Sequence, residues 1–320
     1  MNADSGWGRF ISAEIERFLT AFQQIEIDVA PPNAPAPHIV SVHAPYMMQR
    51  VAMIEKPKEF GYLKKRHQDR LLRVKAAREQ TPEATKAFLQ GYFFDENGRE
   101  KLLAAGRAEL DEMQTLLQEA ANRQLIPISG GQAYLDGRTL RRWLQAYGIG
   151  VDCSSFVQQT LNRLLKTAHA AVGQDGAPDP ICFLRSFRAY KEIKQGRDKG
   201  EPLFTAVPNP AAARPGDILV KYGHIRIVAG VGNGEDGRLI FHLAESTSAP
   251  DIPVGETEEE ADIGPRRLQV CYPAPQQPIS EQMPLRKRLH DPTYKTEPEE
   301  TTYLLGRFIT LDRFCRTYPH

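Results

Sequence analysis

The sequence predicts an α+β protein, because apolar residues recur with helical spacing in its first part and alternate with polar residues further on. Ile11, Ile15 and Phe18 lie on one face of an expected helix. The stretch from Asp217 to Leu243 is rich in β-branched residues that alternate with polar ones, as in antiparallel strands. We therefore expect helices to pack on one antiparallel sheet.

The first 127 residues predict a helical region whose role the sequence does not indicate. Amphipathic helices are expected over residues 4–23 and 58–79, and a long one should end near Arg123. Lys and Arg are frequent in residues 58–79, and we interpret them as a solvated helix face because acidic residues and glutamines dilute the charge. Nucleic acid is accordingly not expected as a partner.

Residues 128–320 predict a mixed domain. A short helix is expected over Thr139 to Tyr147, and strands should begin after the turn at Pro215-Gly216. Residues 232–237 predict the connection of a hairpin. Residues 250–300 are dense in Pro and Glu, which predicts a long surface insertion with one short strand.

The composition is that of an ordinary globular chain. The 320 residues are 41% hydrophobic and 25% charged, with a formal net charge of +1. No stretch is long and apolar enough to span a bilayer, and the N-terminus lacks the basic start and apolar run of a signal peptide. The four cysteines are scattered, so we expect neither a zinc site nor a disulfide framework, and no cofactor: Cys153, Cys182, Cys271 and Cys315.

Cys153 is the cysteine whose position in the sequence favours a catalytic role. It follows a glycine-containing turn, and Phe156, Val157, Thr160 and Leu161 come after it at helical spacing, so Cys153 should begin a buried helix. Backbone N–H groups and the helix dipole favour the thiolate at that position, and the thiolate is the nucleophile. The alternative interpretation is a small, inert core cysteine.

Hydrolysis by a cysteine also needs an imidazole that moves a proton and a third group that orients it. His224 begins a predicted strand, and His242 lies on the returning strand of the hairpin. We expect both side chains on one face of the sheet, where they would meet the sulfur if the Cys153 helix covers that face. Otherwise each histidine is a packed or solvent-edge residue; a metal site would need a third ligand, which is not evident.

Four short motifs resemble the NlpC-type papain-like cysteine peptidases, which cut peptide bonds in bacterial cell-wall peptides. They are Asp152-Cys153-Ser154, Arg214-Pro215-Gly216-Asp217-Ile218, Gly223-His224-Ile225 and Ile240-Phe241-His242. The resemblance covers about residues 130–320 and implies a papain-like domain with the catalytic helix on an antiparallel sheet. It implies Cys153 as nucleophile, His224 as general base and acid, and His242 as the orienting group, with the Cys153 N–H in the oxyanion hole.

The resemblance also implies residues that hold a short peptide. Asp152 and Ser154 flank the nucleophile, although Asp152 could equally do no more than cap the helix. Arg226 stands where the family has a small residue, and would either bind a substrate carboxylate or point to the rim. Ser155 replaces a usual Gly or Ala. The upstream tyrosine-glycine motif of the family is absent in its usual form, and either Tyr134 or Tyr147 could take its place.

The leading functional hypothesis is a cysteine peptidase or amidase that hydrolyses peptide bonds in peptidoglycan stem peptides. One alternative is a thiol-dependent acyltransferase, transglutaminase-like enzyme or deamidase acting on a protein, and another is an inactive binding module. Because cell-wall peptide lies outside the cytoplasm and no export signal is seen, the chain is expected to be cytoplasmic or exported by a non-classical route. As a delivered effector or lytic enzyme it would have a secretion machine or an immunity protein as partner.

Overall fold

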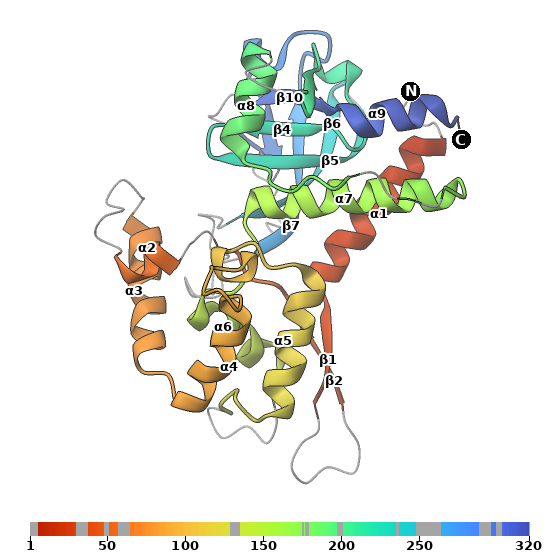
Figure 1. Cartoon of the computed structure of the whole chain (residues 1–320). Helices are drawn as coiled ribbons and strands as arrows, with labels where there is room; N and C mark the ends of the chain where they lie inside the picture. Colours follow the sequence, from red (N-terminus) through yellow and green to blue (C-terminus); the bar gives the residue numbers. More distant parts are fainter. Residues whose placement is uncertain are drawn as a thin grey trace. The chain divides into compact units, whose positions relative to one another are not determined.

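The structure is a computed structural model that combines helices with an antiparallel sheet (Figure 1). It describes residues 6–29, 38–47, 51–56, 65–128, 135–174, 176, 179–196, 201–234, 237–247, 264–287, 296–298 and 303–319. The α+β class expected from the sequence is therefore confirmed.

The helices are α1 (Gly6–Gln23), α2 (Val51–Glu55), α3 (Lys65–Glu79), α4 (Glu83–Phe93), α5 (Leu110–Asn122), α6 (Gly137–Tyr147), α7 (Cys153–Ala171), α8 (Ser186–Gln195) and α9 (Ile309–Thr317), with short 3-10 turns η2 (Leu102–Ala105), η3 (Pro210–Ala212) and η4 (Ile279–Glu281). The strands are β1 (Ile25–Val29), β2 (His38–Val42), β3 (Phe204–Ala206), β4 (Ile218–Lys221), β5 (His224–Asn233), β6 (Leu239–Thr247), β7 (Gly264–Tyr272), β8 (Leu285–Lys287), β9 (Thr296–Pro298) and β10 (Leu304–Phe308). Within the described ranges, no helix has the length and apolar character needed to cross a membrane.

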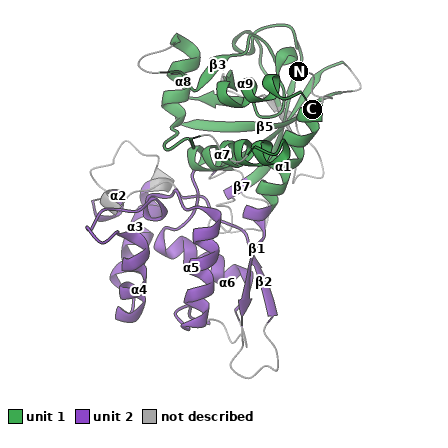
Figure 2. Ribbon diagram, turned by 45° about the vertical axis from the view of Figure 1, so that its right-hand side comes forward, with its two compact units in different colours: residues 1–20, 153–246, 266–320 green, residues 21–152, 247–265 purple. Residues whose placement is uncertain are grey.

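The chain folds into two compact units, shown in different colours in Figure 2. Unit 1 contains residues 1–20, 153–246 and 266–320, and unit 2 contains residues 21–152 and 247–265. The boundary expected between residues 127 and 128 lies inside unit 2. Cys153 is the first residue at which the chain returns to unit 1, so the candidate nucleophile stands at a boundary between the units along the chain.

The main sheet of unit 1 has the strand order β3-β10-β4-β5-β6-β7-β8-β9. One face carries the core of the sheet, which includes Leu219, Val228, Phe241 and Leu243. The opposite face carries Ile218, and Ile193 of α8 packs so closely on Gly306 there that a Cβ at Gly306 would collide with it. Because α7 packs on β5, the cysteine helix and the candidate histidine strand are direct neighbours (Figure 1).

The expected surface insertion over residues 250–300 is in part an interior strand. β7 lies between β6 and β8 in the sheet, and its Leu268, Val270 and Tyr272 belong to the buried core. The short strand predicted in this stretch is thus present, longer than expected, and one of its side chains reaches the candidate site.

The two ends of the described chain meet in unit 1. The indole N–H of Trp7 on α1 donates a hydrogen bond to the carbonyl oxygen of Tyr318, which follows α9. The Trp7 ring also lies edge-on to Phe314, with ring centroids 5.6 Å apart. Trp7 is only 2% exposed, so α1 and α9 share a buried aromatic contact.

Unit 2 contains a β-hairpin that helix α5 supports. β1 and β2 pair with Ile27 opposite Val40, and α5 packs on β1. The amide of Gln118 exchanges hydrogen bonds with both backbone groups of Asp28, at 2.8 and 2.7 Å, and the amide of Gln114 donates to the carbonyl oxygen of Glu26. These two glutamines satisfy backbone groups of β1 that β2 does not reach.

The long helix expected to end near Arg123 is divided. η2 stops at Gly106, whose φ of 71° is the left-handed conformation that glycine adopts without strain. α5 then begins after Glu109, which forms a capping box with Glu112. The leucines before and after this point are helical, in η2 and in α5, but Gly106 ends η2 and so prevents one continuous helix.

Candidate active site

Helix α7 begins at Cys153, as the spacing of the apolar residues predicted. The chain before it is tightly held within unit 2: the backbone N–H of Asp152 donates to Gly106, and a Cβ at Gly150 would collide with the carbonyl oxygen of Pro45. Cys153 is 4% exposed and forms no disulfide. A cysteine at a helix start is placed where backbone N–H groups stabilise a thiolate.

Ser154 connects α7 to α8. Its hydroxyl accepts a hydrogen bond from the backbone N–H of Ser186, the first residue of α8, at 3.2 Å, and lies 3.9 Å from the Cys153 sulfur. The amide of Gln158 likewise accepts from Leu184 at 2.7 Å. The segment that returns from the end of α7 is therefore fastened along α7, and it brings the start of α8 to the start of α7.

His224 begins β5 and pairs with a buried carboxylate. Its Nε2 lies 2.7 Å from Oε2 of Glu245 on β6, and its side chain is 14% exposed. The ring of Tyr303, just before β10, lies edge-on to the imidazole with centroids 6.5 Å apart. With Nε2 bonded to Glu245, the nitrogen left to exchange a proton with a thiol is Nδ1.

Two arginines bond to different carboxylate oxygens of Glu245. Arg226, two residues after His224, donates from Nε to Glu245 Oε2 at 2.7 Å. Arg266 on β7 donates from Nε and Nη2 to Oε1 at 2.9 and 2.8 Å. The Glu245 side chain is 1% exposed, and the guanidinium of Arg226 also lies over the Tyr303 ring at 4.4 Å. A carboxylate this deeply buried needs such partners to remain ionised.

The charges of the cluster set the protonation of its members. Burial alone would raise the pKa of Glu245, but Arg226, Arg266 and His224 together hold its pKa well below the usual range. Burial lowers the pKa of His224, and Glu245 opposes that effect only in part. Near neutral pH the cluster thus contains a carboxylate and a neutral imidazole, which is the form a general base requires.

His242 does not take the position expected for it. It pairs with Gly230, six residues along β5 from His224, after a bulge between Val228 and Gly230. It is exposed, and its Nδ1 lies 3.3 Å from the amide of Gln269. Because side chains alternate along a strand, His242 and Glu245 point to opposite faces of the sheet. The place next to His224 that we expected His242 to hold is held by Glu245.

The other expected binding residues have different surroundings. Arg226 is 4% exposed and bonded to Glu245, so its guanidinium neither points to the rim nor lies open for a substrate carboxylate. Asp152 is half-buried and belongs to unit 2, and Tyr134 lies outside the described residues. Tyr147 packs edge-on against Trp143 in the core of unit 2.

The starts of α7 and β5 both adjoin helix α8. The first residue of α8 is bonded to Ser154, and Tyr190 one turn later contacts the ring of Tyr222, which precedes β5, with centroids 6.5 Å apart. Cys153 and His224 therefore begin two elements that pack on each other, and both elements adjoin α8. By strand alternation the His224 side chain lies on the face that carries Val228, whereas Ile193 of α8 packs on the opposite face. The pairing of Cys153 with His224 therefore stays a prediction.

Sequence reasoning missed Glu245, Arg266 and Tyr303. Glu245 had a signal: a carboxylate directly after the apolar residues Leu243 and Ala244 of a strand needs a partner if it is buried. Arg266 lay in the stretch expected to be a surface insertion.

In the described part of the chain, no group of three or more His, Cys, Asp or Glu side chains gathers as metal ligands would.

Comparison with known proteins identifies no relative. The chain matches no family model, no curated protein and no solved structure.

Proposed function

We propose that unit 1 is a thiol-dependent hydrolase of the papain-like, NlpC type, which cuts peptide bonds in peptidoglycan stem peptides. The observation that carries the proposal is the His224–Glu245 pair, a neutral imidazole oriented by a buried carboxylate at the start of the strand that packs on the Cys153 helix. A helix packed on an antiparallel sheet is also the architecture that the motif resemblance implies.

In this proposal Cys153 attacks and His224 moves the proton. Nδ1 of His224 takes the thiol proton, and the sulfur adds to the carbonyl carbon of the peptide bond. The tetrahedral oxyanion collapses as His224 gives the proton to the leaving amine, which leaves a thioester on Cys153. Water, deprotonated by His224, then cleaves the thioester to release a carboxylic acid and the thiol.

Glu245 takes the role first assigned to His242. It keeps the Nε2 proton on the imidazole, fixes the ring orientation, and stabilises the imidazolium that forms after proton transfer, without itself becoming protonated. Arg226 and Arg266 keep Glu245 ionised during the cycle. His242 has no part in the proposed reaction, and its exposed position makes it a matched control.

Digestion of purified muropeptides, followed by mass spectrometry of the products, tests this proposal. We expect wild type to add one water across a peptide bond, and Cys153→Ala and His224→Ala each to abolish turnover while the thermal unfolding profile is kept. The double variant should be no worse than either single one, because the two residues share a step. His242→Ala should stay close to wild type.

Two results would count against the mechanism. Full activity of Cys153→Ala would show that Cys153 is not the nucleophile. Additive losses of activity for the Cys153 and His224 variants would show that the two residues do not act together. An added amine found in the product, in place of water, would move the assignment to acyl transfer by the same thiol.

A further inference from the structure

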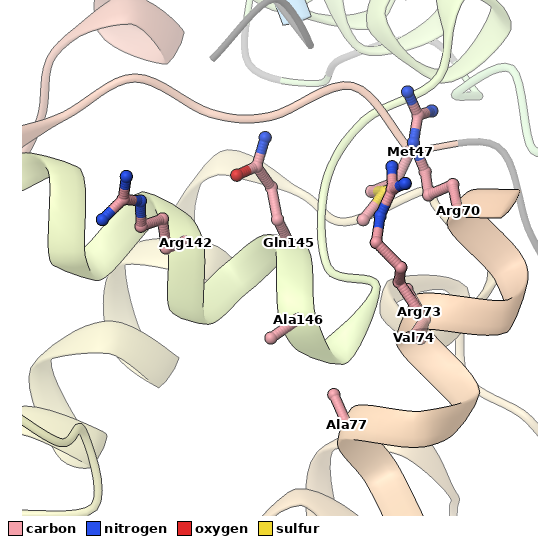
Figure 3. Close-up of a pocket in the computed structure, with 8 residues that line it drawn as sticks. All are labelled: Met47, Arg70, Arg73, Val74, Ala77, Arg142, Gln145 and Ala146. Atoms are coloured by element: carbon pink, nitrogen blue, oxygen red, sulfur yellow. The ribbon is translucent and has the colours of Figure 1, made fainter. Parts of the chain in front are cut away.

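A pocket in unit 2 lies between α3 and α6 and is lined by arginines over an apolar floor (Figure 3). Its volume is about 260 Å³. Arg70 and Arg73 of α3 and Arg142 of α6 line it, while Met47, Val74 and Ala146 supply apolar surface. Figure 3 shows Arg70 and Arg73 close together on α3, whereas Arg142 lies apart from them on α6, with Gln145 between.

These two helices hold far more positive charge than the chain as a whole. α3 and α6 together contain nine Lys or Arg residues and two acidic residues, whereas the formal net charge of the protein is +1. α6 has no acidic residue to balance its arginines. Charge of one sign gathered around a concave site raises the local concentration of oppositely charged ligands.

Some of the basic residues have structural roles, and others do not. Arg78 donates to the carbonyl oxygen of Tyr147 and lies over the Phe93 ring, and Lys75 donates to the carbonyl oxygen of Glu55. Among the residues that the structure describes, Arg73 and Arg142 make no hydrogen bond or ion pair with their side chains. Both are exposed, so their guanidinium groups are available to a ligand.

We propose that this pocket binds the phosphate group of a small phosphate monoester, with an apolar body that rests on Met47, Val74 and Ala146. Guanidinium forks bind phosphate oxygens in pairs, and a dianion balances more of the positive charge along the pocket lining than one carboxylate does. A volume of about 260 Å³ lies just below the usual range for small-molecule pockets, which suits a head group with a small body rather than a polymer.

Calorimetric titration of the full chain with phenyl phosphate at low salt tests the proposal. Arg73→Gln/Arg142→Gln should weaken binding by about tenfold or more, as expected for lost charge-assisted hydrogen bonds. The control Arg99→Gln/Arg313→Gln removes the same charge from exposed sites that do not line the pocket, and should bind within about twofold of wild type. Phenol, which has the ring without the charge, should not bind.

Four outcomes would overturn the proposal. Failure of phenyl phosphate to bind wild type, or equal binding to the pocket variant and to wild type, would show that this pocket is not a phosphate site. Benzoate that binds as tightly as phenyl phosphate, with the same dependence on Arg73 and Arg142, would make this a carboxylate site. A single-stranded oligonucleotide that binds through both arginines and is not displaced by phenyl phosphate would make it a nucleic-acid surface.

Discussion

Two arginines of unit 1 have a buried carboxylate as partner, whereas two arginines of unit 2 have none among the described residues. Arg226 and Arg266 in unit 1 are bonded to Glu245, and all three side chains are mostly or fully buried. Arg73 and Arg142 in unit 2 are exposed and line a pocket whose described lining residues include no acidic side chain. Arginine therefore has a structural role where the fold supplies a carboxylate. Where the fold supplies none, the guanidinium group is available to a ligand.

A second buried ion pair supports this structural role of arginine in unit 1. Arg307 on β10 donates to both carboxylate oxygens of Asp217, each at 2.9 Å, and Asp217 also accepts from the backbone N–H of Arg214. Asp217 is the aspartate of the Pro-Gly-Asp motif. That part of the motif resemblance therefore has a structural explanation of its own: the aspartate ties the turn before β4 to β10.

Glu245→Ala should have the largest effect, because it would leave Arg226 and Arg266 buried without their carboxylate. We expect a loss of about 3–5 kcal/mol in the free energy of unfolding, measured by urea titration. Glu245→Gln keeps the shape and should lose less, while Glu281→Ala, at an exposed glutamate, should change stability by less than about 0.5 kcal/mol. If Glu245→Ala left the free energy of unfolding close to that of wild type, the two buried arginines would not depend on Glu245.

An intermediate effect on stability is expected from His43 in unit 2, because burial and the nearby Arg141 both disfavour a protonated imidazole. Burial, aided by Arg141, lowers the pKa of His43 to about 4, although its ring contacts the carbonyl oxygen of Pro265. Between pH 6.5 and 4 the unfolded chain binds a proton that the folded one does not, so stability falls as pH falls, by up to about 3 kcal/mol.

His43→Gln separates this contribution from that of His224, whose pKa is also lowered. Urea titrations at pH 7 and near pH 4 should show a smaller loss of stability on acidification for the variant than for wild type. An equal loss in both proteins would mean that His43 is not kept neutral by its surroundings.

The smallest effect should come from Arg73→Gln/Arg142→Gln measured without ligand. Because neither side chain has a partner among the described residues, the free energy of unfolding should stay within about 0.5 kcal/mol of wild type, or rise slightly as repulsion is relieved. A loss of more than about 1 kcal/mol would give these arginines a structural role like that of Arg226 and Arg266, and would end the contrast between the units.

Local spacing predicted the elements that depend on local interactions. α1, the start of α7 at Cys153 and strands β4 to β6 follow from apolar periodicity and turn residues. The partner of His224 did not follow, because the bulge after Val228 shifts the pairing of β5 with β6, and a sequence does not show a shift of one residue. The same holds for Arg266, whose strand reaches the sheet only through long-range pairing.

The contact between Trp7 and α9 has a consequence for the order of folding during synthesis. The two residues of its hydrogen bond are 311 positions apart, so α1 leaves the ribosome long before its aromatic partners exist. At the usual rates of bacterial and eukaryotic translation, that delay is roughly 15–60 s. Through this interval the apolar face of α1 has no native cover from α9, and a chaperone that binds nascent amphipathic helices would find its target there.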